Sequence, residues 1–460
     1  MKTPEKPPAW PPFEEMVKSS PEKLKALVVP SEELKQLYLK VNAKYLYWDQ
    51  FKHLPMPNHF KPEEAWWALK MYRNPFKQKL PFIDDRKRPF TYFITPVMQS
   101  LLSKIDQYAA GTLTFMEENA LSSARGQVFI MSSLMEEAIA SSQLEGAVTT
   151  RRKAKEMLRA GRKPVNQDQL MIMNNYNTIV KIREDWKKEK LSPDVIKKIH
   201  KSMTTGTMHE TAQEGAYRTA EDDREGLAVR DENGEVLYAP PPYTEIEKLI
   251  NHLCAFANSE HEDDRFIHPV IKAVILHFWL AYIHPFPDGN GRTARALFYW
   301  YMLSRKYWLF EYISISRIIL NARIQYVKAF LYTEYDECDL NYFILNQLMA
   351  INKAIVDLKE YILKKQSEEK EMTTILKNNE TLQKLNERQR EILFRAIKDP
   401  DTVFTVKGHM RMTDVVYETA RKDLQDLVEA GFLEMKAQQK EYYFIPVAGL
   451  TSKIKIGLRT

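Results

Sequence analysis

The sequence predicts a mainly α-helical chain with one small β-hairpin and a compact helix–strand unit at its carboxyl end. Glycine is rare, at 14 in 460 residues, and apolar residues recur at spacings of three and four over most of residues 95–364. Asn233-Gly234 lies between short apolar runs at 228–230 and 236–238, which is a strong signal for a tight hairpin turn. Beyond residue 386, two helical patterns are followed by two strand patterns.

The boundaries of the elements follow from residues that cap or break helices. Asn166 to Lys187 predicts one amphipathic helix, and Ser192-Pro193 predicts the start of the next. Val270 to Ile283 predicts a buried helix, because it is apolar on all sides and too short to span a bilayer. In the carboxyl-terminal unit the predicted helices and strands cover, in order, 386–397, 414–429, 432–434 and 442–445.

Composition and pattern divide the chain into five regions. They are an extension rich in Pro, Trp and Tyr, with no assigned role, at 1–94; a helical region at 95–194; a helical domain containing the hairpin at 195–364; a charged linker or exposed helix at 365–385; and the helix–strand unit at 386–460.

Composition also excludes several classes of protein. The chain is 28% charged and 44% hydrophobic, as globular proteins are, and its net charge of +6 is compatible with phosphate-bearing ligands without predicting one. The two cysteines, Cys254 and Cys338, lack metal-ligand spacing and favour a reduced, cytoplasmic setting. Met1 to Pro8 has no apolar segment typical of a secretory signal, and no stretch predicts a membrane span.

The segment from His284 to Arg295 concentrates the residues that carry chemistry. An apolar helix pattern stops here, and Pro285 and Pro287 prevent its continuation. Gly289-Asn290-Gly291 then leads into a second helix pattern. A glycine-rich turn into a helix N-terminus presents unpaired backbone N–H groups and the positive end of the helix dipole. The segment therefore predicts an anion-binding site.

Four side chains around this turn supply what phosphoryl or nucleotidyl transfer requires. Arg292 and Arg295 are three residues apart, so they share one helical face and can clamp phosphate oxygens. Asp288 offers an oxygen ligand to Mg²⁺. His284 titrates near neutrality and can accept a proton from a hydroxyl. The Walker A pattern is absent from the sequence, so the prediction rests on these residues alone.

The turn resembles the signature of the Fic family, His-x-Phe-x-Asp/Glu-Gly-Asn-x-Arg-x-x-Arg. Every fixed position is present, at His284, Phe286, Asp288, Gly289, Asn290, Arg292 and Arg295. A signature with so many fixed positions is highly specific. The resemblance covers residues 95–345 and implies a helical Fic core with the hairpin as its flap. It also implies the family reaction, the transfer of AMP from ATP to a serine, threonine or tyrosine hydroxyl of a target protein.

The resemblance implies a role for each position of the turn. His284 is expected to be the general base, Asp288 to bind Mg²⁺ and Phe286 to anchor the loop in the core. The positions expected to hold phosphates are Gly289, Asn290, Gly291, Arg292 and Arg295. ATP is therefore the expected substrate and Mg²⁺ the expected metal.

Segments on either side of the turn extend the resemblance. The hairpin at 228–238 falls where the family keeps its flap, whose edge can align a target protein by strand addition. Gly215-Ala216-Tyr217-Arg218 matches a common family segment, and we interpret Arg218 as structural. Asn321 and Tyr326 resemble residues that close the nucleotide site over adenine or ribose. The alternative for Tyr326 is a core aromatic with a tethered hydroxyl.

Ser141-Ser142-Gln143-Leu144-Glu145-Gly146 resembles the family's inhibitory motif, Ser/Thr-x-x-x-Glu-Gly/Asn. Ser141 and Glu145 are four residues apart, which predicts that they share a helical face, and Gly146 predicts a helix C-cap. The resemblance implies that Glu145 pairs with Arg295 within one chain and occupies the arginine meant for the γ-phosphate. The alternative is an ordinary helix end with a solvated glutamate.

Thr419 to Leu433 resembles the second helix of a winged helix-turn-helix, with its wing tip at 436–441. Arg421 and Lys422 could face a DNA groove. The same helix also carries acidic residues that repel phosphate, namely Glu418, Asp423, Asp426 and Glu429. DNA and a protein partner, including a second copy in a homodimer, therefore both stay open as ligands of this winged-helix domain.

The leading hypothesis is a protein adenylyltransferase that uses Mg·ATP and is restrained by Glu145. One alternative is hydrolysis of an AMP–protein bond at the same site, with Glu145 orienting water. A second is a DNA-binding regulator whose Fic core senses nucleotide. His284 favours an enzyme, because a sensor does not need a general base.

Overall fold

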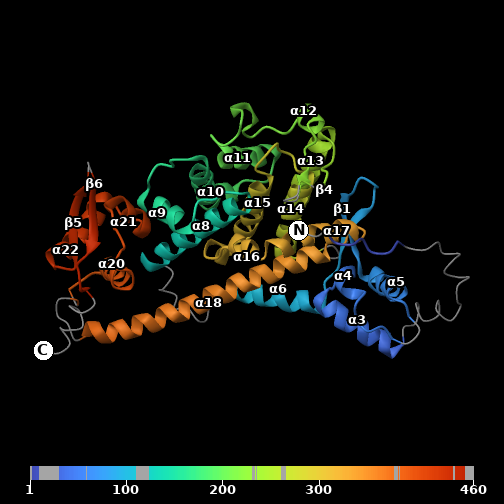
Figure 1. Ribbon diagram of the computed structural model, residues 1–460, viewed down its shortest axis with the longest axis horizontal. Helices are drawn as coiled ribbons and strands as arrows, with labels where there is room; N and C mark the ends of the chain where they lie inside the picture. The colour runs from blue at the N-terminus through green and yellow to red at the C-terminus, as the bar shows by residue number, and fades with distance from the viewer. Residues whose placement is uncertain are drawn as a thin grey trace, which may run out of the picture. The chain divides into compact units, whose positions relative to one another are not determined.

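The computed structural model is a mainly α-helical protein (Figure 1). It describes residues 3–9, 31–57, 60–109, 124–230, 234, 236–260, 266–377, 382, 384–438 and 441–450. Within these residues the strands form antiparallel hairpins of two strands each. No described helix is both long enough and apolar enough to cross a bilayer. The predicted fold class is confirmed.

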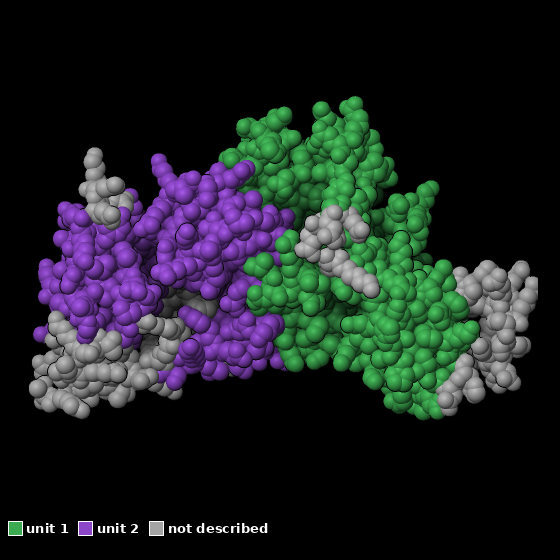
Figure 2. Space-filling model, viewed as in Figure 1, with its two compact units in different colours: residues 1–106, 182–307, 318–352 green, residues 107–181, 308–317, 353–460 purple. Residues whose placement is uncertain are grey.

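The chain folds into two compact units (Figure 2). Unit 1 comprises residues 1–106, 182–307 and 318–352, and unit 2 comprises residues 107–181, 308–317 and 353–460. Some helices contribute residues to both units, namely α6 (Pro96–Ala109), α10 (Gln167–Glu184), α16 (Ile315–Asn321) and α18 (Asn341–Lys377). Each unit is therefore assembled from segments that are distant in the sequence.

Unit 1 contains the predicted turn and the hairpin. Its remaining elements are α3 (Glu32–Lys44), α4 (Trp48–Phe51), α5 (Pro62–Arg73), η1 (Asn74–Phe76), β1 (Gln78–Ile83), β2 (Pro89–Tyr92), η2 (Trp186–Lys188), α11 (Pro193–Thr204), η3 (Thr211–Gln213), α12 (Ala220–Arg224), β3 (Val229–Arg230), β4 (Val236–Tyr238), η4 (Tyr243–Glu245), α13 (Ile246–Asn258), α14 (Pro269–Ile283), α15 (Asn290–Ser304) and α17 (Arg323–Tyr335).

Unit 2 contains the segment that resembles the inhibitory motif and the carboxyl-terminal helix–strand unit. Its remaining elements are α8 (Ala124–Leu144), α9 (Arg151–Ala160), η6 (Trp308–Glu311), α20 (Glu387–Lys398), α21 (Val406–Thr413), α22 (Tyr417–Glu429), β5 (Leu433–Gln438) and β6 (Glu441–Pro446).

The centre of unit 1 is α14, which packs against α13 and α15. Every residue of α14 except Pro269 and Ala281 is buried, which confirms the buried helix predicted at 270–283. The helices predicted from capping residues are confirmed too. Asn166 caps α10 by accepting from the N–H of Gln169 at 2.9 Å, and Ser192 caps α11 by accepting from that of Val195 at 3.2 Å.

The predicted hairpin is present as β3 and β4, which pair antiparallel with Val229 opposite Tyr238 and Arg230 opposite Val236. Gly234 has a φ of 82°, in the left-handed region that a tight hairpin turn requires. Asn233, the other half of the turn signal, lies outside the described residues.

The amino-terminal extension, for which the sequence predicts no strands, carries the hairpin of β1 and β2 and joins the loop between α17 and α18 through buried charges. Lys70 Nζ lies 2.8 Å from Asp336 Oδ1, and Tyr45 Oη donates to Asp339 Oδ2 at 2.8 Å. The N–H of Leu340 donates to the carbonyl of Thr91 in β2 at 2.9 Å. Removing one partner of a buried ion pair strongly destabilises a protein. The extension supplies one partner of such pairs and is therefore an integral part of unit 1.

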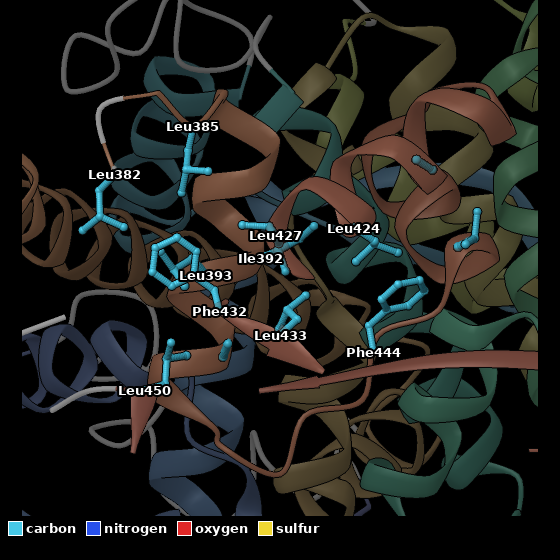
Figure 3. Packing of buried hydrophobic residues seen from close by; sticks show 13 residues of the cluster. Leu382, Leu385, Ile392, Leu393, Leu424, Leu427, Phe432, Leu433, Phe444 and Leu450 are labelled. Atoms are coloured by element: carbon cyan, nitrogen blue, oxygen red, sulfur yellow. The ribbon is translucent and has the colours of Figure 1, made fainter. Parts of the chain in front are cut away.

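The carboxyl-terminal segment has a hydrophobic core of its own (Figure 3). Its buried members are Leu382, Leu385, Ile392, Leu393, Ala396, Val406, Ala420, Leu424, Leu427, Phe432, Leu433, Phe444 and Leu450. We call residues 386–450 the C-terminal module. Its elements follow the order helix–helix–helix–strand–strand, and Phe404 forms a further bridge to Phe444.

The structure corrects one predicted helix boundary in the module and decides between the two alternatives for the region before it. The helix predicted at 414–429 begins at Tyr417, because Asp414 has a φ of 53° and ends α21, a helix that the sequence analysis missed. Residues 365–377 continue α18, so the helical alternative applies to that part of the 365–385 region.

Asp423 of α22 is the polar hub of the C-terminal module. It is buried, and its carboxylate accepts from Asn386 Nδ2 at 2.8 Å, from Arg388 Nε at 2.6 Å and from His409 Nε2 at 3.0 Å. Burial alone would raise the pKa of Asp423, but the hydrogen bonds from these groups lower it well below its usual range. Asp423 therefore joins α20, α21 and α22 through a permanently ionised carboxylate.

Replacing Asp423 with asparagine should destabilise the C-terminal module by about 2 kcal/mol, because Arg388 and His409 lose a charged acceptor in a buried place. Hydrogen exchange of the α22 amides in the full-length protein measures this local free energy of opening. Glu429→Gln, on an exposed position of the same helix, is the control and should leave exchange unchanged. Equal exchange in both variants would contradict the assigned role of Asp423.

Candidate functional site

The predicted anion site is a short turn between two buried helices. α14 ends at His284, which has a φ of 51° and a ψ of 54° and whose N–H still donates to the carbonyl of Leu280 at 3.0 Å. α15 begins at Asn290, preceded by Gly289 with a φ of 79°. The carboxyl end of one buried helix and the amino end of another are therefore separated only by residues 284–289.

The side chain of Asn290 braces this turn. Its Oδ1 accepts from the N–H of Phe286 at 2.9 Å, and its Nδ2 donates to the carbonyl of Phe286 at 2.7 Å. The oxygen and one N–H of the amide are thus used on the backbone of one residue. The backbone N–H of Asn290 lies in the first turn of α15, where helices lack intrahelical acceptors, and the phosphate role of Asn290 stays a prediction.

Phe286 anchors the turn, as predicted from its place in the signature. Its side chain is fully buried, and the ring of His200 lies flat against it, with centroids 3.7 Å apart and ring planes 3° apart. His200 Nδ1 accepts from the N–H of Gly215 at 3.0 Å, so Nε2 carries the proton and donates to the carbonyl of Asp288 at 2.8 Å. Burial lowers the pKa of His200 to about 4, which keeps the ring neutral.

Arg218 holds the backbone of the turn from the other side. Its Nε donates to the carbonyl of His284 at 2.9 Å, and its own N–H donates to the carbonyl of Pro285 at 2.9 Å. The remaining guanidinium nitrogens bond to Asp223 and to the carbonyl of Pro241. Arg218 is buried, and these contacts agree with its interpretation as structural.

The hairpin is tied to the same place. Tyr238 of β4 donates its hydroxyl to the carbonyl of Tyr282, two residues before His284, at 2.7 Å. Burial raises the pKa of Tyr238 well above its ordinary value, so this donor keeps its proton. Val229 and Val236 remain exposed. The hairpin is therefore fixed at its base and presents apolar side chains beyond it.

The imidazole of His284 is half-buried. Its Nδ1 has a long contact of 3.4 Å to the carbonyl of Ala281. Since a carbonyl can only accept, this contact favours the tautomer in which Nδ1 carries the proton and Nε2 the lone pair. This tautomer is the one a general base needs if the incoming hydroxyl approaches Nε2.

The two arginines of the signature are both buried in α15. Arg292 Nη1 donates to the carbonyl of Met203 at 3.2 Å, and Nη2 lies 3.2 Å from Asp288 Oδ2. Arg292 thus connects the end of α11 to the exposed carboxylate of Asp288. Its contact with phosphate stays a prediction.

Arg295 lies close enough to His277 to change the pKa of that imidazole. Burial, and then the charge of Arg295, lower the pKa of His277 to about 3. His277 Nε2 bonds with the hydroxyl of Tyr326 at 2.9 Å. Tyr326 is therefore tethered in the way its structural alternative predicts, although its ring is only half-buried and a nucleotide contact stays a prediction. Asn321 is exposed.

The arrangement offers a place for an anion and a place for a divalent cation. Gly289, Asn290 and Gly291 lie at the amino end of α15, where the helix dipole favours negative charge. Among the described residues, no group of three or more His, Cys, Asp or Glu could hold a metal ion by itself. Asp288, whose side chain is 62% exposed, fits Mg²⁺ only with phosphate oxygens and water as further ligands, which is how Mg²⁺ commonly binds.

The segment that resembles the inhibitory motif lies in unit 2 and ends α8. The N–H of Ala147 donates to the carbonyl of Ser142 and that of Gly146 to Gln143, a Schellman motif with Gly146 at a φ of 98°. The predicted C-cap is thus confirmed. α8 itself ends at Leu144, so Glu145 belongs to the closing turn and Ser141, which is buried, to the helix. Their shared role, and the pairing of Glu145 with Arg295 of unit 1, stay predictions.

Two supporting residues escaped the sequence analysis. His200 lies in a predicted helix, but nothing in its spacing indicates that it contacts the turn 88 residues later. Glu137 is buried in α8, and its carboxylate accepts from the hydroxyl of Ser314 and from the N–H of Ser316, both at 2.9 Å. It thereby caps α16. The signal available in the sequence was a glutamate within a largely apolar helical stretch.

Comparison with known proteins identifies part of the chain. Residues 190–302 match the Fic/DOC family. The chain is 35% identical over 111 residues to the protein adenylyltransferase Fic of Nematostella vectensis, covering 24% of this chain and 22% of that protein. It is 42% identical over 60 residues to the protein of that name from Drosophila melanogaster, covering 13% of this chain and 12% of that protein. The chain thus spans less than a quarter of the length of these relatives.

Comparison with solved structures gives matches at low identity. A Fic family protein from Desulfovibrio desulfuricans G20 has 18% identity and a TM-score of 0.48, covering 78% of this chain and 98% of that one. Fic-1 (aa134 - 508) from C. elegans has 17% identity and a TM-score of 0.45, covering 57% of this chain and 71% of that one.

Gly289→Ala should lower the free energy of unfolding by about 2 kcal/mol. The added Cβ would lie 2.8 Å from Thr204 Cγ2 and 3.2 Å from His200 Nε2, at a φ of 79° that alanine disfavours. Gly234→Ala is the matched control, because its φ of 82° is similar but nothing lies within 4 Å of the new Cβ. Urea unfolding of both variants separates the steric from the backbone contribution, and equal losses would contradict the close packing at Gly289.

The neutral His200 predicts a pH-dependent stability. Its pKa of about 4 in the folded protein lies below the unfolded value of about 6.5, so the unfolded chain binds the extra proton between these pH values. Stability from this ring is therefore complete above pH ~6.5 and falls as the pH drops toward ~4. Relative to His200→Gln, the wild type should lose up to about 3 kcal/mol over this range in urea unfolding. Parallel curves for the two proteins would contradict it.

Proposed function

We propose that this chain, whose residues 190–302 form a Fic/DOC-family domain, transfers AMP from Mg·ATP to a serine, threonine or tyrosine hydroxyl of a target protein. The observation that carries the proposal is the braced turn, in which His284 lies a few residues before a helix N-terminus and an exposed carboxylate. The names of the matched relatives support the same reaction. None of the described residues favours the hydrolase or the DNA-binding regulator over it.

In the proposed reaction, His284 Nε2 takes the proton of the target hydroxyl as its oxygen attacks the α-phosphorus of ATP. A phosphoester bond forms to AMP, the bond from the α-phosphorus to the bridging oxygen breaks, and pyrophosphate leaves. The hydrogen bond from Arg218 to the carbonyl of His284 and the stack of Phe286 on His200 fix the base relative to α15. Such positioning is worth large rate factors, because small misplacements are costly.

The triphosphate would be held by the amino end of α15 and by Arg295, with Arg292 completing the set if it exchanges Asp288 for phosphate. Mg²⁺ bound to Asp288 would neutralise charge on the β- and γ-phosphates. Asn321 and Tyr326 would lie at the adenosine end. Burial, and then the charge of Arg295, lower the pKa of His277 to about 3, so this imidazole is neutral and adds no positive charge beside Arg295.

The β3–β4 hairpin would receive the target. Its two strands are short and Val229 and Val236 are exposed, so an extended segment could add to its edge. Because Tyr238 and Arg218 tie the base of the hairpin to residues 282–285, a segment bound there would have a fixed relation to His284.

Glu145 would restrain the reaction by pairing with Arg295 in place of the γ-phosphate. What supports this part is the match of residues 141–146 to the inhibitory motif and the Schellman turn at Gly146 that carries the carboxylate. A carboxylate–guanidinium pair that excludes a phosphate from the same arginine would act as a switch.

Glu145→Gly should incorporate label from α-³²P-ATP into itself or into a lysate protein, whereas the wild type should incorporate little. Label from γ-³²P-ATP should not be transferred, because pyrophosphate leaves. Adding His284→Ala should reduce the labelling roughly 100-fold or more, and EDTA should abolish it. Glu225→Gly, at an exposed position of unit 1, is the control for loss of a carboxylate. A folded Glu145→Gly protein without label in the presence of Mg²⁺ would contradict the transferase.

A further inference from the structure

The residue proposed as inhibitory lies in the short connection between α8 and α9. We call residues 145–150 the elbow. Glu136 of α8 binds Arg151 and Lys155 of α9, so the two helices are tied on either side of the elbow. Thr150 begins α9 by accepting from the N–H of Lys153. Any displacement of α9 would therefore be transmitted to the elbow.

The body of α8 is held firmly within unit 2. Glu137 is buried beneath the hydroxyl and N–H groups of Ser314 and Ser316. Asn175 of α10 donates to the carbonyl of Ala138 and lies 3.3 Å from the Ser142 hydroxyl. These contacts are all buried. They fix α8 between Glu137 and Ser142. The elbow itself is held by the hydrogen bonds from Gln143 Nε2 to the carbonyl of Thr149 and from the N–H of Val148 to Asp168 Oδ2, and it continues into α9.

The C-terminal module contacts these same two helices through α21. Arg411 Nη1 donates to the carbonyl of Leu158 in α9 at 3.2 Å. The Arg411 guanidinium covers Gly161, where an added Cβ would lie 2.4 Å from its Cζ. An added Cβ on Gly408 would lie 3.0 Å from the carbonyl oxygen of Arg159. The backbone of α21 therefore lies close to the backbone at the carboxyl end of α9. Arg411 also places its positive charge there, where the helix dipole favours a cation.

This contact differs from the packing inside the module. Among the described residues, the members of this core cluster lie between 382 and 450 (Figure 3). The contact with α9 includes the hydrogen bond of Arg411 and the close backbone approach at Gly408. Because the members of the cluster come from the carboxyl-terminal segment itself, they would stay packed on one another if α21 left α9.

The junction also contains an unfavourable charge pair. Arg159 of α9 has a buried Nε without a hydrogen-bond partner. Burial, and then the nearby guanidinium of Arg395 in α20, lower the pKa of Arg159. A buried, unsatisfied donor next to a like charge costs free energy. The repulsion between Arg159 and Arg395 thus lowers the stability of the docked arrangement and makes its release easier.

Part of α22 and of β6 is exposed while α21 contacts α9. Arg421 and Lys422 of α22 are exposed, as are Tyr417 and Tyr442. Asp423 and Asp426 of the same helix are engaged inside the module, by Arg388 and by Gln389 respectively. A ligand could therefore bind α22 without competing for the surface that meets α9.

We propose that docking of α21 on α8 and α9 is a second lock on the adenylylation site. The docked module holds the elbow so that Glu145 stays in its inhibitory position, and undocking the module frees the elbow and releases Arg295 for ATP. The proposal rests on the proposed function and deepens it, because it assigns the regulation of that site to the C-terminal module.

The test measures α-³²P labelling by the full-length protein carrying Arg411→Ala. Loss of one charge-assisted hydrogen bond should raise the labelling rate about threefold to tenfold over the wild type. Arg421→Ala, which removes the same charge from the exposed face of the same module, should leave the rate unchanged. Gly408→Ala should act like Arg411→Ala, because its methyl group would lie 3.0 Å from the carbonyl oxygen of Arg159 in α9 and 2.9 Å from Thr405 Oγ1, which caps α21.

The decisive comparison uses the Glu145→Gly background. If the lock acts through Glu145, Arg411→Ala should add nothing there, so the two changes are non-additive. Equal stimulation in both backgrounds, or wild-type labelling by both Arg411→Ala and Gly408→Ala, would overturn the lock while an active Glu145→Gly protein leaves the transferase standing. Failure of Glu145→Gly to label would instead overturn the transferase.

The docking of α21 on α9 can also be tested by a measurement that does not use ATP. Hydrogen exchange of backbone amides in residues 143–161 should quicken in Arg411→Ala and in Gly408→Ala, but not in Arg421→Ala, since only the first two loosen α9. Far-UV circular dichroism equal to the wild type verifies that the variants are folded. Unchanged exchange in both interface variants would overturn the docking role of α21.

Discussion

The brace between Asn290 and the backbone of Phe286 is the interaction on which the rest of the site depends. It closes a six-residue passage between two helices whose side chains are almost entirely buried. The helix axes fix where the passage begins and ends, and the brace fixes its path. His284, the exposed Asp288 and the amino end of α15 take their relative positions from it. His200 and Arg218 then secure the same turn from two sides.

Burial controls the charge of this region as well as its shape. Two imidazoles, those of His200 and His277, lie next to arginines and are kept neutral. A protonated imidazole beside Arg292 or Arg295 would repel the guanidinium, so the neutral histidines avoid this repulsion in a buried place. The same principle operates in the C-terminal module, where Asp423 stays ionised because Arg388 and His409 surround it.

Much of this could be predicted from the sequence, because the signals are local. Ser192-Pro193 and Asn166 began helices, Gly146 ended one, and the apolar run after residue 270 became a buried helix. The acidic residues of α22 show where such reasoning stops. Asp423 and Asp426 accept hydrogen bonds from Arg388 and Gln389 of α20, and the sequence pattern did not indicate these partners. Helical spacing indicates which residues share a face, and it does not indicate which neighbour covers that face.

The sequence by itself determined the helical class, the hairpin and the turn at 284–295 with its chemical groups, because each depends on residues within a few positions of one another. Only the tertiary structure decided that His200 and Arg218 position this turn and that α21 lies against α9. Those contacts join residues separated by 88, 66 and about 250 positions, and no periodicity records them. Packing of whole helices selects such partners, so they become visible only when the chain has folded.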